Sequence, residues 1–377
     1  MVQVALIGAG YIGPIHLNAL ARIAGVKVKR VIDVNAALAA KAACDYNIES
    51  FGTDWREAVS DPAIDVIHNC TPNKHHFQIN KEALNQGKQV FTEKPLCLSL
   101  AEADELVNLA EKKKAVTGIG FCYRYYPVVQ EMAVRVRRGD AGAVRLVTGT
   151  WFQDWLSREQ DWSWRLLAAE SGESNITADL GSHWFDLIQF VTGLEVKQVI
   201  GDLAILLPVR RRPKHQVLAF EKVDRVETEE VKVELEDYSS VLFRLSNGAP
   251  GSFTTSQVCC GRKSDTEFQV YGAECSYAWN HREATVLWIG HREKPNEILI
   301  ENAALQDPAS ARYATLPAGH PQGYYEAMMH MFKDYYEALE GRGSPWRATF
   351  AAGRWEMKIL QAILASHRER RWVEVRP

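Results

Sequence analysis

Residues 5 to 13 read "ALIGAGYIG", in which an apolar run that suits a buried strand leads into a turn rich in glycine. Gly8, Gly10 and Gly13 have the spacing G-x-G-x-x-G, and a helical pattern follows them. Glycines at these places let the backbone approach a pyrophosphate, which then lies at the positive end of the helix. Asp33 ends the next predicted strand, where a carboxylate can bind a ribose 2′-hydroxyl and repel a 2′-phosphate. The turn therefore predicts dinucleotide binding, with NAD preferred over NADP.

Short β-branched runs alternate with longer helical patterns over the first ~120 residues, which is typical of βαβ units on a parallel sheet. A capping box at Ser99 to Glu102 marks the start of one of the helices. We therefore expect an α/β fold with an N-terminal Rossmann domain over residues 1–122. The predicted strands are 2–7, 26–33, 64–70, 88–93 and 115–121.

The alternation stops in the second part of the chain. Strand-like stretches with Gly-rich turns fill residues 143–280, and amphipathic helical patterns follow them. We expect a C-terminal α+β domain over residues 123–377, built on a large open sheet that is mainly antiparallel or mixed. Residues 210–230 have dense charge of both signs and no clear period, so we interpret them as an excursion loop whose basic start, Arg210 to Lys214, is solvated.

Composition excludes several classes of protein. Among the 377 residues, 46% are hydrophobic and 24% charged, which are ordinary globular values. The net charge of −3 lacks the basic excess of a nucleic-acid binder, and no apolar run approaches the ~20 residues of a membrane span. The seven cysteines form no C-x-x-C pair, so neither a zinc site nor a disulfide framework is expected. We predict a cytoplasmic protein without metal, nucleic-acid or membrane partners.

Polar residues follow two of the predicted strands. "TPNKHH" occupies residues 71–76 after the strand that ends near residue 70, and "EKP" occupies residues 93–95 after the next one. Ligands of open parallel sheets bind beyond the carboxyl ends of the strands. Pro95 cannot continue a strand ladder, so Lys94 is expected at the rim, where the nicotinamide half of the cofactor should lie.

A third candidate lies in "TADLGSHWFDLIQF", residues 177–190. Read as a helix, it has an apolar stripe at core spacing, and Asp179, His183 and Asp186 recur at the same spacing on a neighbouring face. A carboxylate and an imidazole one turn apart can perform acid–base chemistry. A helix cap at Asp179 and a hydrogen-bonded histidine at His183 are the structural alternative, and a solvated or ion-paired residue is expected at Asp186.

Together, "GAGYIGPIH", "TPNKHH", "EKPL" and "DLGSHWFDL" resemble the Gfo/Idh/MocA oxidoreductase family over nearly the whole chain. The resemblance implies that His183 is the general base, that Asp179 orients it, and that Lys94 polarises the reacting oxygen. This chain lacks the glycine run that precedes the D-x-G-x-H segment in many relatives, which bears on the shape of the substrate pocket. The resemblance also implies a homodimer or homotetramer formed through the C-terminal sheet.

The resemblance extends the set of expected site residues. Arg124, Gln153, Trp155 and His320 are expected near the substrate, together with the catalytic residues Lys94, Asp179 and His183. The expected cofactor-binding residues are Gly8, Gly10, Tyr11, Ile12, Gly13, Asp33, Thr71, Pro72, Asn73, His76, Glu93, Lys94 and Arg165.

These residues indicate an NAD-dependent oxidoreductase that transfers a hydride between nicotinamide and a ring secondary alcohol of a sugar, sugar derivative or cyclitol. Two other functions stay open. One is a redox-neutral glycosidase that retains its NAD, and the other is a non-catalytic, sugar-responsive regulator that binds NAD.

Overall fold

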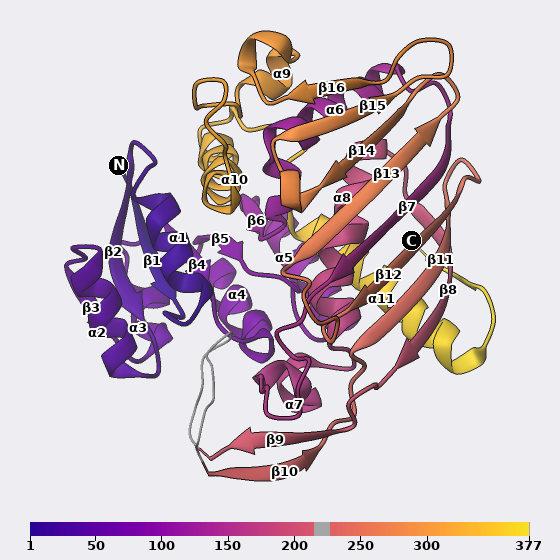
Figure 1. Cartoon of the computed structure of the whole chain (residues 1–377). Coiled ribbons are helices and arrows are strands. Elements are labelled where there is room, and N and C mark those ends of the chain that lie inside the picture. Colours follow the sequence, from indigo (N-terminus) through magenta and orange to yellow (C-terminus); the bar gives the residue numbers. More distant parts are fainter. Residues whose placement is uncertain (215–226, 377) are drawn as a thin grey trace. The chain divides into compact units, whose positions relative to one another are not determined.

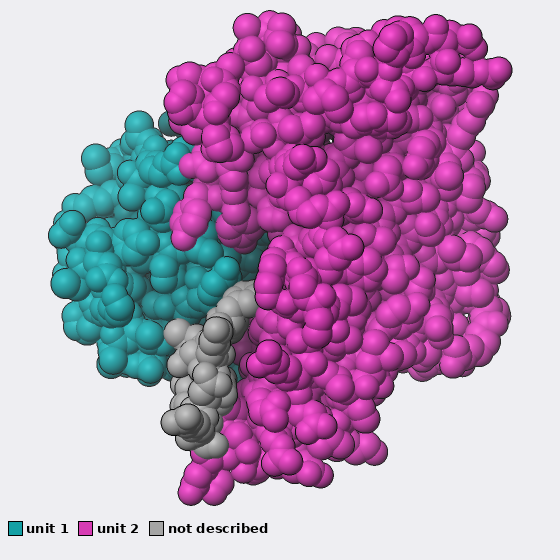
Figure 2. Space-filling view, in the orientation of Figure 1, with its two compact units in different colours: residues 1–121, 169–172, 328–357 teal, residues 122–168, 173–327, 358–377 magenta. Residues whose placement is uncertain are grey.

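The computed structural model describes residues 1–214 and 227–376, which form two compact units (Figure 2). The first unit contains Met1–Phe121, Ala169–Gly172 and Met328–Met357, and the second contains the remaining described residues. The segment 328–357 thus belongs to the first unit although it lies far along the chain. No helix in the described part of the chain is both long and apolar enough to cross a membrane.

A six-stranded parallel sheet forms the first unit, in the order β3-β2-β1-β4-β5-β6 (Figure 1). This is the strand order of the doubly wound dinucleotide-binding fold, so the predicted Rossmann domain is confirmed. The strand β3 was not predicted from the sequence; its three residues, SFG, include no β-branched residue and end in glycine. The strands are β1 (Val2–Ile7), β2 (Val26–Ile32), β3 (Ser50–Gly52), β4 (Val66–Asn69), β5 (Gln89–Thr92) and β6 (Thr117–Ile119).

Helices connect these strands, and their ends follow the capping signals of the sequence. At the start of α5, the Ser99 hydroxyl accepts the Glu102 N–H at 3.3 Å, and the Glu102 carboxylate accepts the Ser99 N–H at 3.1 Å. The predicted capping box is therefore confirmed. The helices are α1 (Ile12–Leu20), α2 (Ala36–Asp45), α3 (Trp55–Ser60), α4 (His76–Asn85) and α5 (Leu100–Lys113).

The core of the first unit draws on both ends of the chain. Ile119 and Leu96 are fully buried in one apolar cluster with Ala348, Phe350 and Met357. The last three residues come from the segment 328–357, which includes most of α10 (Tyr324–Leu339) and the start of α11 (Phe350–Glu369). This part of the chain is therefore integral to the dinucleotide-binding unit.

The second unit is built on a nine-stranded sheet in the order β16-β15-β14-β13-β7-β12-β11-β8-β17 (Figure 1). Its neighbouring strands are antiparallel except for β12 and β7, which are parallel, so the predicted large mixed sheet is confirmed. The strands are β7 (Val144–Phe152), β8 (Val196–Ala204), β11 (Tyr238–Leu245), β12 (Pro250–Ser256), β13 (Asp265–Gly272), β14 (Ser276–Asn280), β15 (Val286–Gly290), β16 (Glu297–Ile300) and β17 (Val373–Glu374).

Helices of the second unit lie against this sheet. The helix α8 (Ser182–Thr192) places Trp184 in a stacked contact with Phe253 of β12, with ring centroids 4.4 Å apart. Buried aromatic pairs of this kind stabilise a core beyond their area alone. The apolar stripe predicted from the sequence is therefore the face by which α8 packs on the sheet. Other helices of this unit are α6 (Pro127–Arg138) and α9 (Pro308–Ala311), whereas most of α7 (Ala168–Ser171) belongs to the first unit.

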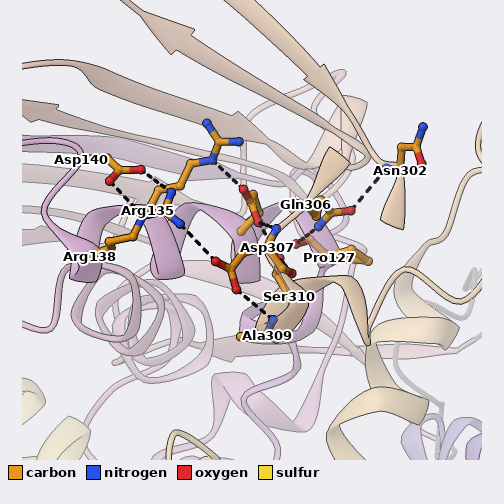
Figure 3. A network of polar contacts seen from close by, with 10 residues as sticks. Pro127, Arg135, Arg138, Asp140, Asn302, Gln306, Asp307, Ala309 and Ser310 are labelled. Atoms are coloured by element: carbon orange, nitrogen blue, oxygen red, sulfur yellow. Dashed lines mark hydrogen bonds and ion pairs between the residues drawn. The ribbon is translucent and has the colours of Figure 1, made fainter. Parts of the chain in front are cut away.

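A polar network joins α9 to α6 (Figure 3). The buried Glu131 carboxylate binds the Arg135 guanidinium at 2.6 Å and accepts hydrogen bonds from the Asp307 N–H at 2.8 Å and the Ser310 hydroxyl at 2.5 Å. Gln306 adds a bond to the Pro127 carbonyl at 3.0 Å. The short helix α9 is thus held by the Glu131 carboxylate, which accepts hydrogen bonds from several donors at once.

The predicted excursion loop is only partly correct. Strands β9 (Val209–Pro213) and β10 (Thr228–Lys232) form a two-stranded antiparallel sheet, and residues 215–226 lie outside the described residues. Arg210 was expected to be solvated, but it is fully buried and donates to the carbonyls of Leu156 and Arg158 and to Asp237. The expectation is wrong at Arg210 because carbonyl and carboxylate oxygens from distant segments accept hydrogen bonds from its two terminal nitrogens.

Candidate active site

The glycine turn between β1 and α1 is tightly packed on one side and open on another. A Cβ atom at Gly8, where φ is +99°, would lie 2.5 Å from the Cys70 carbonyl oxygen, and one at Gly13 would lie 2.3 Å from the Gly8 carbonyl oxygen. A Cβ atom at Gly10 would have no described atom within 4 Å. The space beside Gly10 lies before the first turn of α1, where Tyr11 forms no side-chain cap. Close packing at Gly8 and Gly13 with room at Gly10 fits a bound pyrophosphate.

Asp33 anchors this turn from the end of β2. One carboxylate oxygen accepts the Ala9 N–H at 2.7 Å, and the other accepts the Asn35 N–H at 2.8 Å. A carboxylate has further lone pairs, so these contacts are compatible with an additional hydroxyl donor. Asp33 therefore brings a fixed negative charge to the glycine turn.

Polar side chains support the turn after β4. Asn69 is buried, and its carbonyl oxygen accepts the Thr71 hydroxyl at 2.7 Å. His76 is fully buried, with Nδ1 2.7 Å from the Pro95 carbonyl and Nε2 2.8 Å from the Thr71 carbonyl. Burial lowers the pKa of His76, while the two carbonyl contacts oppose that shift. The two ring nitrogens of His76, an expected cofactor contact, join the turn that begins at Thr71 to the turn at Pro95.

The turn at Glu93–Pro95 follows β5. The Glu93 carboxylate lies 2.9 Å from Nε2 of the fully buried His16 and also accepts the Lys94 N–H at 3.4 Å. Lys94 is partly buried and is joined to Pro95 by a cis peptide bond. The structure thus places Lys94 directly after a carboxylate that is held in the interior.

In the second unit, Asp179 and His183 lie where a π-helical turn, Thr177–Gly181, passes into α8. The Asp179 carboxylate lies 3.1 Å from the Gln257 amide nitrogen and 3.5 Å from Nε of Arg165. The His183 ring is 8% exposed and packs edge-on against Tyr123, with centroids 5.2 Å apart. The sequence predicted a regular α-helix here, and the wider turn is a difference of the kind often found at functional sites.

Buried polar groups stabilise the start of the π-helical turn. The Glu236 carboxylate accepts the Thr177 N–H at 3.1 Å, the Asn175 N–H at 3.2 Å and the Ser174 hydroxyl at 2.5 Å. Burial raises the pKa of Glu236, and these donors act in the opposite direction. The Asn175 amide also bonds the Gln257 side chain at 3.2 Å. Gln257 therefore links this support to Asp179.

Arg124, an expected substrate contact, has a buried ion-pair partner in the second unit. Its guanidinium binds both carboxylate oxygens of Asp186, including a bond from Nε at 2.6 Å. Burial raises the pKa of Asp186, and Arg124 opposes this shift. Asp186 is therefore ion-paired, one of its two expected states, and not solvated.

The other expected contacts of the second unit have different surroundings. Gln153 is buried, and its side-chain oxygen accepts the Trp155 indole N–H at 2.8 Å. The Arg165 guanidinium lies over the Trp164 ring at 4.5 Å. His320 lies in an exposed loop, with Nδ1 3.2 Å from the Pro317 carbonyl.

Sequence reasoning missed several residues that support the site. His68 and His16 are fully buried around the Glu93–Pro95 turn, and Gln257 binds Asp179. A histidine in the middle of the apolar strand 64–70 was a usable signal, because a strand buried on both faces rarely contains an ionisable residue. Gln257 gave no comparable signal.

The doubly wound sheet and its glycine turn define a dinucleotide-binding protein. A model of the "Oxidoreductase family, NAD-binding Rossmann fold" matches residues 2–121, and a model of the "GFO/IDH/MocA C-terminal domain" matches residues 129–278. The chain belongs to the GFO/IDH/MocA family and is an NAD-binding oxidoreductase.

Named relatives extend this comparison. Levoglucosan dehydrogenase from Pseudarthrobacter phenanthrenivorans is 28% identical over 99% of this chain and 98% of its own. The NAD(+)-dependent scyllo-inositol 2-dehydrogenase from Bacillus subtilis is 29% identical over 54% of this chain and 58% of its own. A solved levoglucosan dehydrogenase in complex with NADH and levoglucosan superposes with a TM-score of 0.89 at 26% identity, covering all of both chains.

Proposed function

We propose that this protein is an NAD-dependent dehydrogenase that oxidises a ring secondary alcohol of a sugar, sugar derivative or cyclitol. The observation that carries the proposal is the Asp179 carboxylate, held between Gln257 and Arg165 one turn before His183. Support comes from the match to levoglucosan dehydrogenase over nearly the full length of both chains. An anhydrosugar is accordingly the first substrate to test.

The first unit provides residues suited to hold the cofactor. Gly8, Gly10, Gly13 and the start of α1 would hold the pyrophosphate, and Asp33 would accept a ribose hydroxyl. The negative charge of Asp33 favours NAD over NADP in this proposal, because it repels a 2′-phosphate. Bound NAD supplies a hydride acceptor.

Three side chains would handle the substrate. His183 accepts the hydroxyl proton, since an imidazole can accept a proton at neutral pH. Asp179 orients that imidazole, and the Lys94 ammonium stabilises the charge that develops on the oxygen as the carbon loses its hydride. The carbinol would thus become a ketone, with its proton held by His183, and bound NAD would supply the acceptor for the hydride.

The other expected substrate contacts can be ranked by the partners that each side chain already has. Gln153 and Trp155 would border the sugar ring, with Arg165 beside Asp179. Arg124 and His320 are to be tested after them, since the Arg124 guanidinium already binds Asp186 and His320 lies in an exposed loop.

The direct test mixes the protein with NAD or NADP and with levoglucosan, free sugars, glycosides and inositols, while the absorbance of reduced nicotinamide is followed. An increase with NAD and one of these rings supports the proposal. If NADH binds but no ring reduces NAD, the proposal fails. Cleavage of a glycoside without net reduction would then favour the glycosidase, and no reaction would favour the regulator.

Replacing Lys94 with Ala tests the catalytic assignment. We expect kcat to fall by about 10²–10³-fold, as when a donor to a developing oxyanion is removed, with NADH affinity largely unchanged. Lys81→Ala, which removes a lysine that is ion-paired with Glu105 in the same unit, is the control. Turnover equal to that of the control would rule out this role for Lys94.

A further inference from the structure

Four polar side chains of the first unit form a continuous chain that is buried except at Glu93, whose side chain is 12% exposed. Tyr336 of α10 lies with its hydroxyl 2.8 Å from Nε2 of His68 in β4. The Nδ1 atom of His68 lies 3.1 Å from Nδ1 of His16 in α1, and Nε2 of His16 lies 2.9 Å from the Glu93 carboxylate. All three separations are hydrogen-bond distances. The exposed fractions are 0% for both histidines and 6% for Tyr336.

The chemistry of the Glu93 carboxylate sets the direction of this chain. A carboxylate only accepts hydrogen bonds, so His16 must carry a hydrogen on Nε2. A neutral His16 then accepts at Nδ1, and His68 must donate from its own Nδ1. This leaves Nε2 of His68 as the acceptor for the Tyr336 hydroxyl. Each donor therefore points toward Glu93.

Two neighbouring groups agree with this direction. The Cys70 sulfur lies 3.2 Å from Nδ1 of His16, and burial raises the pKa of this thiol well above its usual value, so it stays neutral and brings no charge to the chain. Burial holds the pKa of His68 well below its usual value, and any positive charge on His16 would lower it further. Both effects favour neutral groups with single, defined hydrogen positions.

Close packing restricts movement of the groups in the chain. The His68 ring is stacked on the rings of Phe91 and Tyr336, with centroids 5.1 and 6.0 Å away. A Cβ atom at Gly120 would lie only 2.6 Å from the Glu93 carboxylate, so the glycine permits the close contact there. The backbone N–H of Lys94 donates to the other Glu93 oxygen at 3.4 Å. The position of the Glu93 carboxylate and that of the Lys94 backbone are therefore coupled.

We propose that His16, His68 and Tyr336 are positioning residues, whose one-way chain of hydrogen bonds fixes the Glu93 carboxylate and, through it, the backbone of Lys94. The consequence for catalysis rests on the proposed function, in which Lys94 acts on the substrate oxygen. The direction of the chain does not depend on that function.

The first experiment measures the tautomers of the two histidines. In NMR spectra that correlate ring hydrogens with nitrogens in protein labelled with ¹⁵N-histidine, we expect His16 to be protonated at Nε2 and His68 at Nδ1. His16→Gln and His68→Gln assign the two signals. The opposite tautomers, or a doubly protonated ring at neutral pH, would overturn the proposed chain.

The second experiment separates positioning from general stability. We expect His16→Leu to lower kcat at least about tenfold, the effect of losing a hydrogen bond to a charged group, with the NADH dissociation constant nearly unchanged. His16→Gln, whose amide can still donate to Glu93, should recover most of kcat. Tyr336→Phe should lower kcat, whereas Tyr335→Phe should not, since that hydroxyl binds the Val116 carbonyl outside the chain.

These outcomes distinguish the two proposals. An active wild-type enzyme whose His16→Leu variant keeps its kcat, or loses kcat and NADH binding equally, contradicts the positioning role. If the wild-type protein reduces NAD with none of the ring compounds tested, the proposed function is contradicted. In that case the predicted tautomers would still establish the chain, without the catalytic consequence.

Discussion

Asp33 has a structural role at the glycine turn, and under the proposed function it would also determine cofactor specificity. Its two oxygens accept backbone N–H groups of Ala9 and Asn35, so the carboxylate is held at the glycine turn before any ligand is bound. A charge held in this way can discriminate between a ribose hydroxyl and a ribose phosphate without rearrangement.

Replacing Asp33 with Asn should therefore change cofactor preference. Asparagine keeps one acceptor for the turn and loses the negative charge, so the ratio of kcat/KM for NAD over NADP should fall about tenfold, or ~1.4 kcal/mol. Steady-state kinetics with both cofactors measures the ratio, and Asp45→Asn on the exposed face of α2 is the control. An unchanged ratio of kcat/KM values would mean that other residues discriminate between the ribose hydroxyl and the ribose phosphate.

Gln257 offers a second residue-level test. Gln257→Leu removes the donor to Asp179, and a hydrogen bond to a charged group contributes ~1.5–3 kcal/mol, so kcat should fall roughly 10- to 100-fold. Gln269→Leu removes one side-chain hydrogen bond from β13 and should leave kcat unchanged. If the two variants behave alike in kinetics and in thermal unfolding, Gln257 has no role beyond packing.

At this scale the sequence predicted which residues are chemically suited to the site but not the partners of each. Asp33 and Lys94 stand in motifs with recognisable spacing, whereas the environment of Arg210 depends on carbonyls more than 50 residues away. His76 belongs to a predicted cluster, yet its two carbonyl partners could be identified only once the turns were folded.

Among the elements, the turn between β1 and α1 contains one glycine that the fold itself requires and another that only a bound ligand would require. Gly13 is required by the protein itself, because any side chain would collide with the Gly8 carbonyl. Gly10 has no such neighbour among the described residues. Its lack of a side chain matters only if a ligand occupies that space.

Gly10→Ala and Gly13→Ala should accordingly differ. We expect Gly10→Ala to unfold within a few degrees of the wild type but to bind NADH at least about tenfold more weakly, because its methyl group takes space at the pyrophosphate. Gly13→Ala should lower the unfolding temperature clearly, since backbone must move to relieve the overlap. Calorimetry and NADH fluorescence titration test both. Tight NADH binding by Gly10→Ala would contradict the assigned pyrophosphate position.

Element prediction succeeded where periodicity was long enough and failed where it was not. Five strands of the first sheet and the capped helix α5 were predictable, but β3, with the sequence SFG, has no β-branched residue to mark it. The turn Thr177–Gly181 has the composition of an α-helix, and its wider hydrogen bonding depends on buried partners such as Glu236.

For the whole molecule, buried histidines link stability to pH. Burial lowers the folded-state pKa of His68, His76 and His281 below the value of about 6.5 expected in the unfolded chain. Below that pH the unfolded chain binds more protons than the folded one. The stability contributed by the neutral rings is therefore complete above pH ~6.5 and is lost as the pH falls toward the folded-state values.

We expect these histidines to lower the unfolding temperature between pH 7.5 and pH 5.5 at constant ionic strength, against an opposite contribution from Glu301, whose burial raises its pKa to about 7. Each histidine that stays neutral in the folded protein lowers the free energy of unfolding by up to about 1.4 kcal/mol for each pH unit below its unfolded-state pKa. His68→Gln should reduce this slope, whereas replacement of the exposed His320 should not. Equal slopes for the two variants would show that His68 does not contribute to acid sensitivity.

The contribution of residues 328–357 to the first unit has a consequence for protein synthesis. Ala348, Phe350 and Met357 complete a core whose other members precede residue 122, so that core stays unfinished until a segment made more than 200 residues later leaves the ribosome. At 5–20 residues per second, the delay is roughly 10–50 s. During that interval the nascent dinucleotide-binding unit exposes apolar surface, and a chain truncated before residue 328 would keep it exposed permanently.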